Sequence, residues 1–261
     1  MHMKKLIIGL AAVAAVAVGM VSCNNKDGQY QIVVEPNGEE SAVWAPGEAI
    51  ASWDNTLVAT EVYVSDEVVD GRATLQMPEG LQTDGARCFA YPAAAYAGEG
   101  KVSIPTVQSG VDYKQLMPYM AQTAEDAGAL RFMSLCGLVC LHITTAEQLS
   151  GVSVSTDDTL AFLSGLFGVE GYPQVTLVAE EGMGGVKSVR CEDLSQIDFS
   201  QGADVVFCVA PGKYKTITVT MTTADGRVCV KHQKEDMVVE VNRNNVATII
   251  MGAGENVLAF E

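Results

Sequence analysis

Two pairs of cysteine and histidine residues come nearest to a metal-binding pattern in this sequence. Cys140 and His142 are two positions apart and would share one face of a β-strand, whereas Cys229 and His232 are three apart and would face opposite sides. A four-ligand site would therefore need an irregularity in the second strand. We expect no metal site, no cofactor, and an exposed strand position for His142.

Acidic pairs such as Asp157-Asp158 and Glu180-Glu181 are the other groups that could do chemistry. Neighbouring residues on a strand point to opposite faces, so such a pair does not supply a general acid and a general base to one substrate. The sequence also lacks the patterns of a phosphate-binding loop, a serine nucleophile elbow or a calcium loop. We therefore expect no catalytic residues and no enzymatic activity.

A single cysteine, Cys23, ends an N-terminal segment of distinctive composition. Lys4 and Lys5 precede an apolar run from Leu6 to Val18, small residues follow, and the chain turns polar after Cys23. This layout of residues 1–23 resembles a bacterial lipoprotein signal, which implies lipid on the Cys23 thiol and cleavage before it. The alternative is an uncleaved membrane helix, but the run is shorter than the roughly 20 apolar residues that such a helix needs. We expect an N-terminal lipid anchor in the outer membrane.

The charge of the chain restricts its partners. The sequence has 16 Lys and Arg against 32 Asp and Glu, a net charge of −16. Loss of Lys4 and Lys5 with the signal leaves 14 basic residues and a net charge of −18. Because an acidic chain repels phosphate groups, we expect no nucleic-acid partner and contact with the membrane only through the lipid.

Short alternating segments between turn residues predict an all-β protein. The 238 residues after the signal suggest two domains, 24–128 and 129–261, joined through an irregular linker at Tyr113 to Ala129 that Pro118 interrupts. The longest apolar strand, Leu130 to Thr144, opens the second domain. The expected strands of the first domain are Gln29 to Val34, Ala49 to Trp53, Thr60 to Val64, Ala73 to Gln76, Ala86 to Ala90 and Val102 to Ile104.

A hairpin is predicted around Asp225-Gly226. A two-residue turn there pairs Met221 with Val230, buries Val228 and Val230, and leaves Cys229 on the outer face. The cysteines that follow the signal show no paired framework, and we expect small apolar residues that fill sheet positions. They are Cys88, Cys136, Cys140, Cys191, Cys208 and Cys229.

Several short motifs occur in a particular order along the chain. They are Trp44-Ala45-Pro46-Gly47-Glu48, Phe89-Ala90-Tyr91-Pro92, Ile104-Pro105 with Gln108, Met117-Pro118, Leu130-Arg131-Phe132, Leu135-Cys136-Gly137, Leu163-Ser164-Gly165, Ala210-Pro211-Gly212 with Tyr214, and Ala224-Asp225-Gly226. Behind a lipoprotein signal, this order resembles the fimbrillin-type lipoproteins of Bacteroidales, which are subunits of type V pili and related surface adhesion proteins. The resemblance covers most of residues 29–261. It implies two tandem β-sandwich domains of transthyretin-like topology.

The resemblance also implies other pilus subunits as partners, joined by strand exchange. In this family a protease cuts after Arg or Lys beyond the first strand and frees the lipid. This chain has no basic residue between Lys26 and Arg72, and a cut at Arg72, the only early candidate for processing, would remove several strands. We therefore expect a retained anchor and an anchoring, accessory or stand-alone adhesion subunit at the cell surface.

Two further interpretations concern sugars. Asp158-Thr159-Leu160 resembles the short O-glycosylation signal of Bacteroidetes, which implies Thr159 as the acceptor. An alternative function is a glycan-binding surface lipoprotein of a polysaccharide-uptake system. Such binding needs exposed aromatic rings on which sugars can stack, and Trp44 and Trp53 are the candidates.

Overall fold

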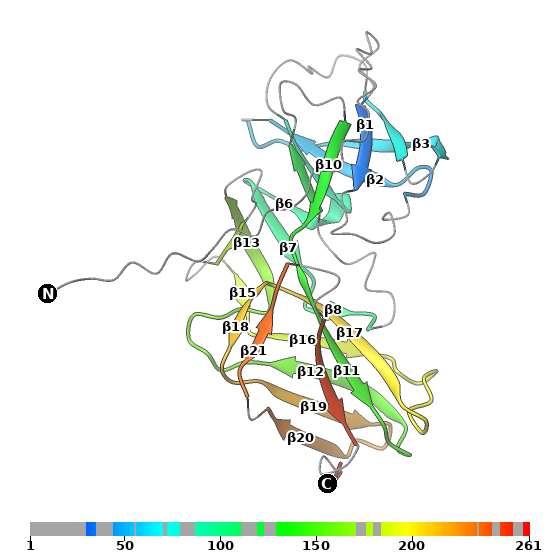
Figure 1. Cartoon of the computed structure of the whole chain (residues 1–261), viewed down its shortest axis with the longest axis vertical. Helices are drawn as coiled ribbons and strands as arrows, with labels where there is room; N and C mark the ends of the chain where they lie inside the picture. The colour runs from blue at the N-terminus through cyan, green and yellow to red at the C-terminus, as the bar shows by residue number, and fades with distance from the viewer. Residues whose placement is uncertain are drawn as a thin grey trace, which may run out of the picture.

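The residues that the structure describes form β-strands and one short helix, η1 (Ala93–Ala95) (Figure 1). The structure is a computed structural model that describes residues 30–34, 44–54, 56–69, 72–78, 87–110, 119–122, 129–170, 176–179, 184–233, 235–241, 246–252 and 258–261. Within these ranges no helix has the length and apolar character needed to cross a membrane. The all-β prediction is confirmed.

Seven strands of the N-terminal half form a closed barrel in the order β1-β10-β9-β5-β2-β3-β4. They are β1 (Tyr30–Val34), β2 (Ala49–Trp53), β3 (Thr60–Val69), β4 (Arg72–Gln76), β5 (Cys88–Tyr91), β9 (Tyr119–Gln122) and β10 (Ala129–Ser134). Every strand therefore has two neighbours and no edge is left unpaired. This closed sheet takes the place of the sandwich predicted for residues 24–128.

The predicted linker contains a strand of the barrel. β9 follows Pro118 directly and pairs with both β5 and β10, with Ala90 opposite Met120 and Met133 also opposite Met120. The expectation of an irregular segment over Tyr113 to Ala129 is therefore wrong for residues 119–122. Four residues are too few to give a clear two-residue period, so tertiary pairing rather than local pattern defines this strand.

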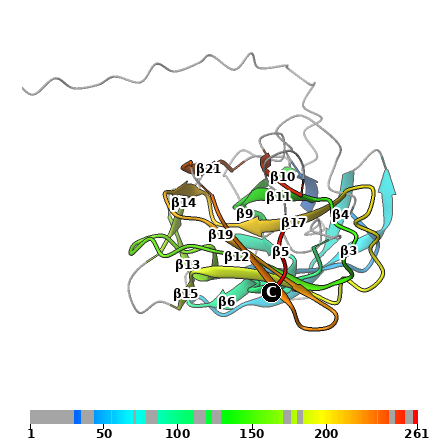
Figure 2. The ribbon, with the colours of Figure 1, turned by 90° about the horizontal axis from the view of Figure 1, so that it is seen from below.

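Two sheets of the C-terminal half face each other across a second core. One is β17-β11-β22, from β17 (Ala203–Val209), β11 (Gly137–Ile143) and β22 (Val246–Met251). The other is β20-β19-β12-β16-β8, from β20 (Val228–His232), β19 (Thr218–Thr223), β12 (Leu149–Ser155), β16 (Ser188–Glu192) and β8 (Val107–Gln108). Viewed from below, β11 and β17 belong to one layer and β12 and β19 to the other (Figure 2).

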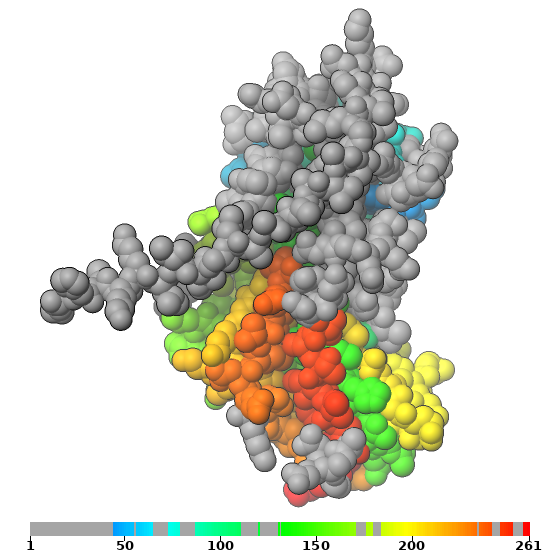
Figure 3. Space-filling model, viewed as in Figure 1, coloured from blue at the N-terminus to red at the C-terminus, as the bar shows by residue number. Residues whose placement is uncertain are grey.

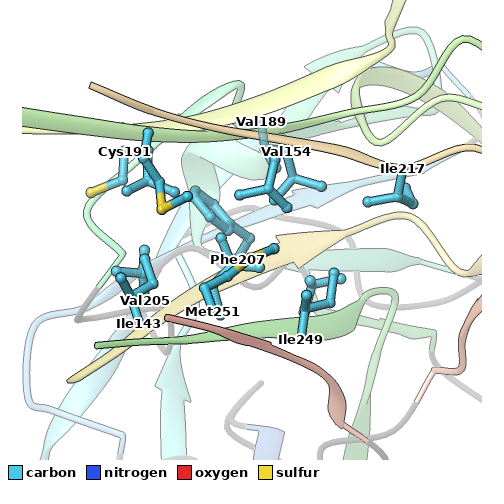
Figure 4. Packing of buried hydrophobic residues seen from close by; sticks show 14 of the residues in the cluster. Ile143, Val154, Val189, Cys191, Val205, Phe207, Ile217, Ile249 and Met251 are labelled. Atoms are coloured by element: carbon cyan, nitrogen blue, oxygen red, sulfur yellow. The ribbon is translucent and has the colours of Figure 1, made fainter. Parts of the chain in front are cut away.

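The core between these sheets is filled by alternating apolar side chains. Phe207 and Val205 of β17 lie opposite Val154 and Val189 of the other sheet (Figure 4), and all four are fully buried. Val139, Leu141 and Ile143 of β11 point into the same core, as the two-residue period predicts.

Two smaller sheets complete the described chain. One has the order β14-β13-β7-β6, with β15 also paired to β13, and consists of β6 (Tyr96–Gly98), β7 (Lys101–Ile104), β13 (Ser164–Glu170), β14 (Thr176–Val178) and β15 (Gly185–Val186). The other pairs β18 (Gly212–Tyr214) with β21 (Met237–Val239). On one face of the molecule β21, β22, β11 and β17 lie in succession (Figure 3).

Strands from both sides of the predicted boundary after residue 128 pair with one another. β10 belongs to the barrel although it follows residue 128, whereas β7 and β8 precede it and pair with β13 and β16. The predicted strand Leu130 to Thr144 is divided at Leu135-Cys136 into β10 and β11, one in each half. The boundary itself stays a prediction.

Glycine at position 137 is required by the close approach of another segment. A Cβ atom on Gly137 would lie 2.3 Å from the backbone oxygen of Glu240, closer than any real contact. The chain at Glu240 therefore lies too close to β11 for a side chain at position 137.

The hairpin at Asp225-Gly226 forms, but its predicted register is wrong by one residue. Thr223 N–H donates to Arg227 O at 2.9 Å, so the loop has three residues, and its last, Gly226, has φ of 88°. A three-residue loop that ends in a left-handed glycine shifts the second strand by one position relative to a two-residue turn.

The shift reverses the faces of β20. Met221 lies opposite Cys229, and Thr220 lies opposite Val230. Cys229 is therefore buried at 2% exposure, whereas Val228 and Val230 are 37% and 49% exposed. A shift of one residue moves every side chain of a strand to the other face.

Candidate functional site: the first strand and the predicted surface residues

The first strand, β1, lies between two neighbours in the barrel. It runs parallel to β10, with Ile32 opposite Leu130, and antiparallel to β4, with Ile32 opposite Ala73. Main-chain hydrogen bonds on both sides therefore hold it in place. If β1 left the barrel, β4 and β10 would become unpaired edges able to accept another extended segment.

The strands that flank β1 present apolar side chains to the barrel core. Ala73 and Leu75 of β4 are 4% and 0% exposed, and Leu130 and Phe132 of β10 are 2% and 0% exposed. The alternation along both strands places these four side chains on one face. A vacated β1 position would therefore join two unpaired edges to an apolar surface, which is the arrangement that an exchanged strand needs.

Arg72, the predicted processing residue, is the first residue of β4. Its backbone lies opposite Val33 of β1 and Val69 of β3. A protease must draw the chain on both sides of the cleaved bond into an extended conformation, so cleavage here requires this end of β4 to leave the sheet. Processing at Arg72 stays a prediction.

The two predicted modification sites differ in how far the structure describes them. Cys23 lies outside the described residues, and its lipidation stays a prediction. Thr159 is exposed in a turn, beside Leu160 at 87% exposure, and Asp158 Oδ2 accepts a hydrogen bond from Lys215 N–H at 2.7 Å. The acceptor hydroxyl is thus on an accessible and anchored turn, and its glycosylation also stays a prediction.

The two tryptophans considered for sugar stacking are buried. Trp44 is 2% exposed and makes edge contacts with Tyr91 and Phe132 at ring-centroid distances of 4.9 and 5.3 Å. Trp53 is 3% exposed and stacks on Tyr96 at 4.1 Å. These rings stabilise the first core, and neither offers an open face to a sugar.

The cysteine and histidine pairs are separated in the structure. His142 Nδ1 lies 2.7 Å from Asp204 Oδ1, and the His142 side chain is 42% exposed. Burial raises the pKa of the neighbouring Cys140 thiol to about 11, so the thiol is protonated at neutral pH. Cys229 points into the core. Over the described ranges, no group of three or more His, Cys, Asp or Glu residues is placed to hold a metal ion.

All six cysteines within the described ranges are free, and all except Cys88 are buried. Cys136 and Cys208 lie in the first core cluster, and Cys191 and Cys229 in the second. Their packing agrees with the expected role as small apolar residues in sheets.

Gln108 has a structural role that its sequence position does not reveal. It is 3% exposed, and its Oε1 accepts from Cys208 N–H at 2.8 Å. Its Nε2 donates to the carbonyl oxygens of Cys208 at 2.7 Å and Pro105 at 2.8 Å. The side-chain amide thus pairs with β17 as a neighbouring strand would. The only signal in the sequence is an isolated glutamine three residues after Pro105.

The backbone around Gln108 joins the two sheets of the second core. Val107 and Gln108 form β8 beside β16, and Gly110 O accepts from Val206 N–H of β17 at 2.8 Å. One segment therefore contacts the edge strands of both sheets. It also connects the second core to β7, which lies nearer the barrel (Figure 1).

Comparisons with known proteins gave similarity at the level of solved structures. Searches of protein-family models and of curated proteins found no match. A candidate cell adhesion protein from Bacteroides fragilis has a TM-score of 0.41 and 14% identity, with 89% of this chain and 93% of that chain covered. A second, from Bacteroides thetaiotaomicron, has a TM-score of 0.44 and 12% identity over 87% and 94%.

A third similar structure is the tip fimbrial protein Mfa3 from Porphyromonas gingivalis with a C-terminal truncation. It has a TM-score of 0.33 and 12% identity, with 78% of this chain and 81% of that chain covered. At 12 to 14% identity, these likenesses concern the arrangement of strands.

Proposed function

We propose that this chain is a lipid-anchored structural or adhesion protein of the bacterial cell surface, and an anchoring, accessory or stand-alone subunit of the fimbrillin type. The lipoprotein-like signal ending at Cys23 and the ordered motifs of residues 29–261 support this assignment. The observation that carries it is the place of β1, the first described strand, which closes a barrel over an apolar face.

The position of β1 relates the anchor to the fold. Tyr30, where β1 begins, is seven residues after Cys23. Seven extended residues span at most about 25 Å, so a lipid on Cys23 holds the barrel close to the membrane while β1 remains in place. Two or three acyl chains make such an anchor stable.

Strand exchange at this position would require β1 to leave the barrel. An incoming extended segment would then pair with β4 and β10, and its alternate side chains would cover Ala73, Leu75, Leu130 and Phe132. The paired backbone of Arg72 argues that the chain keeps β1, and with it the lipid. A retained anchor fits a subunit at the base of an assembly or a subunit that acts alone.

The experiment that tests the anchor is fractionation and surface protease shaving of the native host, with mass spectrometry of the mature N-terminus. We expect a lipidated Cys23 terminus and surface exposure, and a Cys23→Ser variant should carry no lipid and keep residues 1–22. Cys88→Ser removes a cysteine elsewhere and is the matched control, which should be lipidated and cleaved like the unaltered chain.

Three outcomes would contradict the proposal in different ways. A Cys23→Ser variant that is still lipidated and cleaved would refute the lipid anchor at Cys23, and a mature terminus at Ala73 would refute its retention. A protein that shaving does not reach would refute the adhesion role.

A further inference from the structure

Three loops meet at the end of the second core that lies away from the barrel. They connect β11 to β12, β16 to β17, and β19 to β20. A cavity of about 180 Å³ lies between the first two loops and is lined by residues 145–148 and 195–199. We infer that this cavity, named here the end pocket, binds a single sugar residue of an uncharged glycan.

The end pocket is held open by contacts between its loops. Gln148 Nε2 donates to Ser195 O at 3.1 Å, and Thr145 N–H donates to Phe199 O at 3.0 Å. These bonds fix the distance between the two loops. A cavity formed before the ligand arrives avoids the entropic cost of ordering loops on binding.

The third loop fixes one wall of the end pocket. Both carboxylate oxygens of Glu147 pair with the guanidinium of Arg227, with Nη1 to Oε1 at 3.1 Å. Arg227 Nε also donates to Asp225 Oδ2 at 2.9 Å. A bidentate pair restrains the Glu147 side chain more than a single contact would, and it joins the hairpin to the loop after β11.

The groups around the end pocket match a hydroxylated ligand. Carboxylates and amide oxygens accept hydrogen bonds from sugar hydroxyls, and amide N–H groups donate to them. The polar side chains of the lining are those of Thr145, Glu147, Gln148, Ser195, Gln196 and Asp198. Ile197, which is partly exposed, gives the lining an apolar side chain against which the carbon atoms of a sugar ring can rest.

The charges at the end pocket select an uncharged ligand. Asp198 is ionised at neutral pH because the Ser200 N–H, 2.9 Å from its Oδ1, holds the pKa of that carboxyl below its usual range. The cation beside the pocket, Arg227, is already paired with two carboxylates. An anionic ligand would therefore meet repulsion, and the described lining has too few convergent ligands for a metal ion.

The size of the end pocket limits the bound part of the ligand to one sugar residue. Its volume of about 180 Å³ is below the ~300–1,000 Å³ common for ligand sites. That space suits one sugar ring and leaves the neighbouring units of a glycan outside.

The position of the end pocket suits an adhesion protein, and this step rests on the proposed function. β1 lies in the barrel, whereas β11 runs toward the opposite end of the molecule (Figure 1), and residues 145–148, which follow β11, line the end pocket. A protein tethered through Cys23 would therefore present this end away from its own membrane.

The test uses the mature chain from residue 23 and methyl glycosides of galactose, mannose, fucose and N-acetylglucosamine, with sialic acid as the anionic probe. Binding is measured by saturation-transfer NMR and calorimetric titration. We expect at least one neutral glycoside to bind. Asp198→Asn, which keeps an acceptor for Ser200, and Gln196→Ala should each weaken that binding by about tenfold.

The matched control is Asp236→Asn, which removes an exposed carboxylate paired with Lys213 and far along the chain from the pocket loops. It should leave the affinity unchanged. Absence of binding by all four neutral glycosides, a preference for sialic acid, or equal affinities in all three variants would overturn the inference. Each of these results can occur with surface exposure and Cys23 anchoring intact, so the two proposals fail separately.

Discussion

The role of Gln108 as a side-chain substitute for a neighbouring strand gives a quantitative prediction. Gln108→Met keeps the length of the side chain but removes all three hydrogen bonds, to Cys208 N–H, Cys208 O and Pro105 O. Loss of a partner for a buried polar group costs about 1–3 kcal/mol. Since two of the three bonds satisfy the backbone of the buried Cys208, we expect the free energy of unfolding to fall by about 3 kcal/mol.

The assay is urea unfolding of the mature chain followed by far-UV circular dichroism and by tryptophan fluorescence. Trp44 and Trp53 belong to the first core, so fluorescence reports on the barrel while dichroism reports on all sheets. For a chain of this size the expected loss corresponds to a Tm lower by about 6–12 °C. A dichroism transition that shifts while the fluorescence transition does not would show that the loss lies outside the barrel.

Two comparisons make the Gln108 prediction specific. Gln201→Met, the same change at an exposed position, should alter stability by less than about 0.5 kcal/mol. Gln108→Glu should destabilise more than Gln108→Met, because a buried carboxylate accepts but does not donate to the two carbonyl oxygens. If Gln108→Met were as stable as Gln201→Met, the bridging role of the amide would be refuted.

Four further predictions follow from single sites. Arg87→Met removes a buried guanidinium that bonds Ser52 and Asp54 and should cost about 2 kcal/mol in urea unfolding; a loss no larger than that of the exposed Arg190→Met would contradict this. Burial raises the pKa of the Cys191 thiol to about 11, so the folded state favours the neutral thiol. The stability from this group is complete below its ordinary pKa of 9.0 and is lost as pH rises from there to about 11. Between pH 8 and 11 the melting temperature of Cys191→Ala should decline less than that of the unaltered chain, and equal declines would contradict this prediction. Gly137→Ala places a Cβ against the backbone of Glu240 and should cost about 3 kcal/mol, whereas Gly151→Ala, with its nearest atom at 3.4 Å, should be nearly neutral; equal melting temperatures would refute the close approach. Protein from the native host should carry a glycan mass that Thr159→Ala removes, and an unmodified Thr159 peptide would disprove the acceptor prediction.

Local patterns predicted much of the secondary structure. Residues 49–53 were expected to form a strand and form β2, and the apolar run from Leu130 to Thr144 contains β11. These predictions succeeded because a short run of apolar and small residues between turn residues indicates a strand even where both of its faces are buried, as in β2 and most of β11.

The hairpin at Asp225-Gly226 shows where local pattern was insufficient. Aspartate followed by glycine marks a turn, but both a two-residue and a three-residue loop contain that pair. The packing of Met221 and Cys229 in the second core decides between them, and it exposes Val228 and Val230. Apolar content therefore gave the wrong face for β20.

The sequence by itself determined the class of the protein: its signal-like segment ending at Cys23, its acidic charge, its β-strands and the positions of most turns. These properties depend on composition and on neighbours within a few residues. Only the tertiary structure decided that β9 and β10 close a barrel with β1, that both tryptophans are buried, and that Gln108 bonds β17.

The end pocket is another feature that only the tertiary structure decided, because the pairing of β11 with β17 brings residues 145–148 and 195–199 together. Contacts between segments far apart in the chain depend on which strands pair, and the residues near each strand in the sequence do not determine its partner.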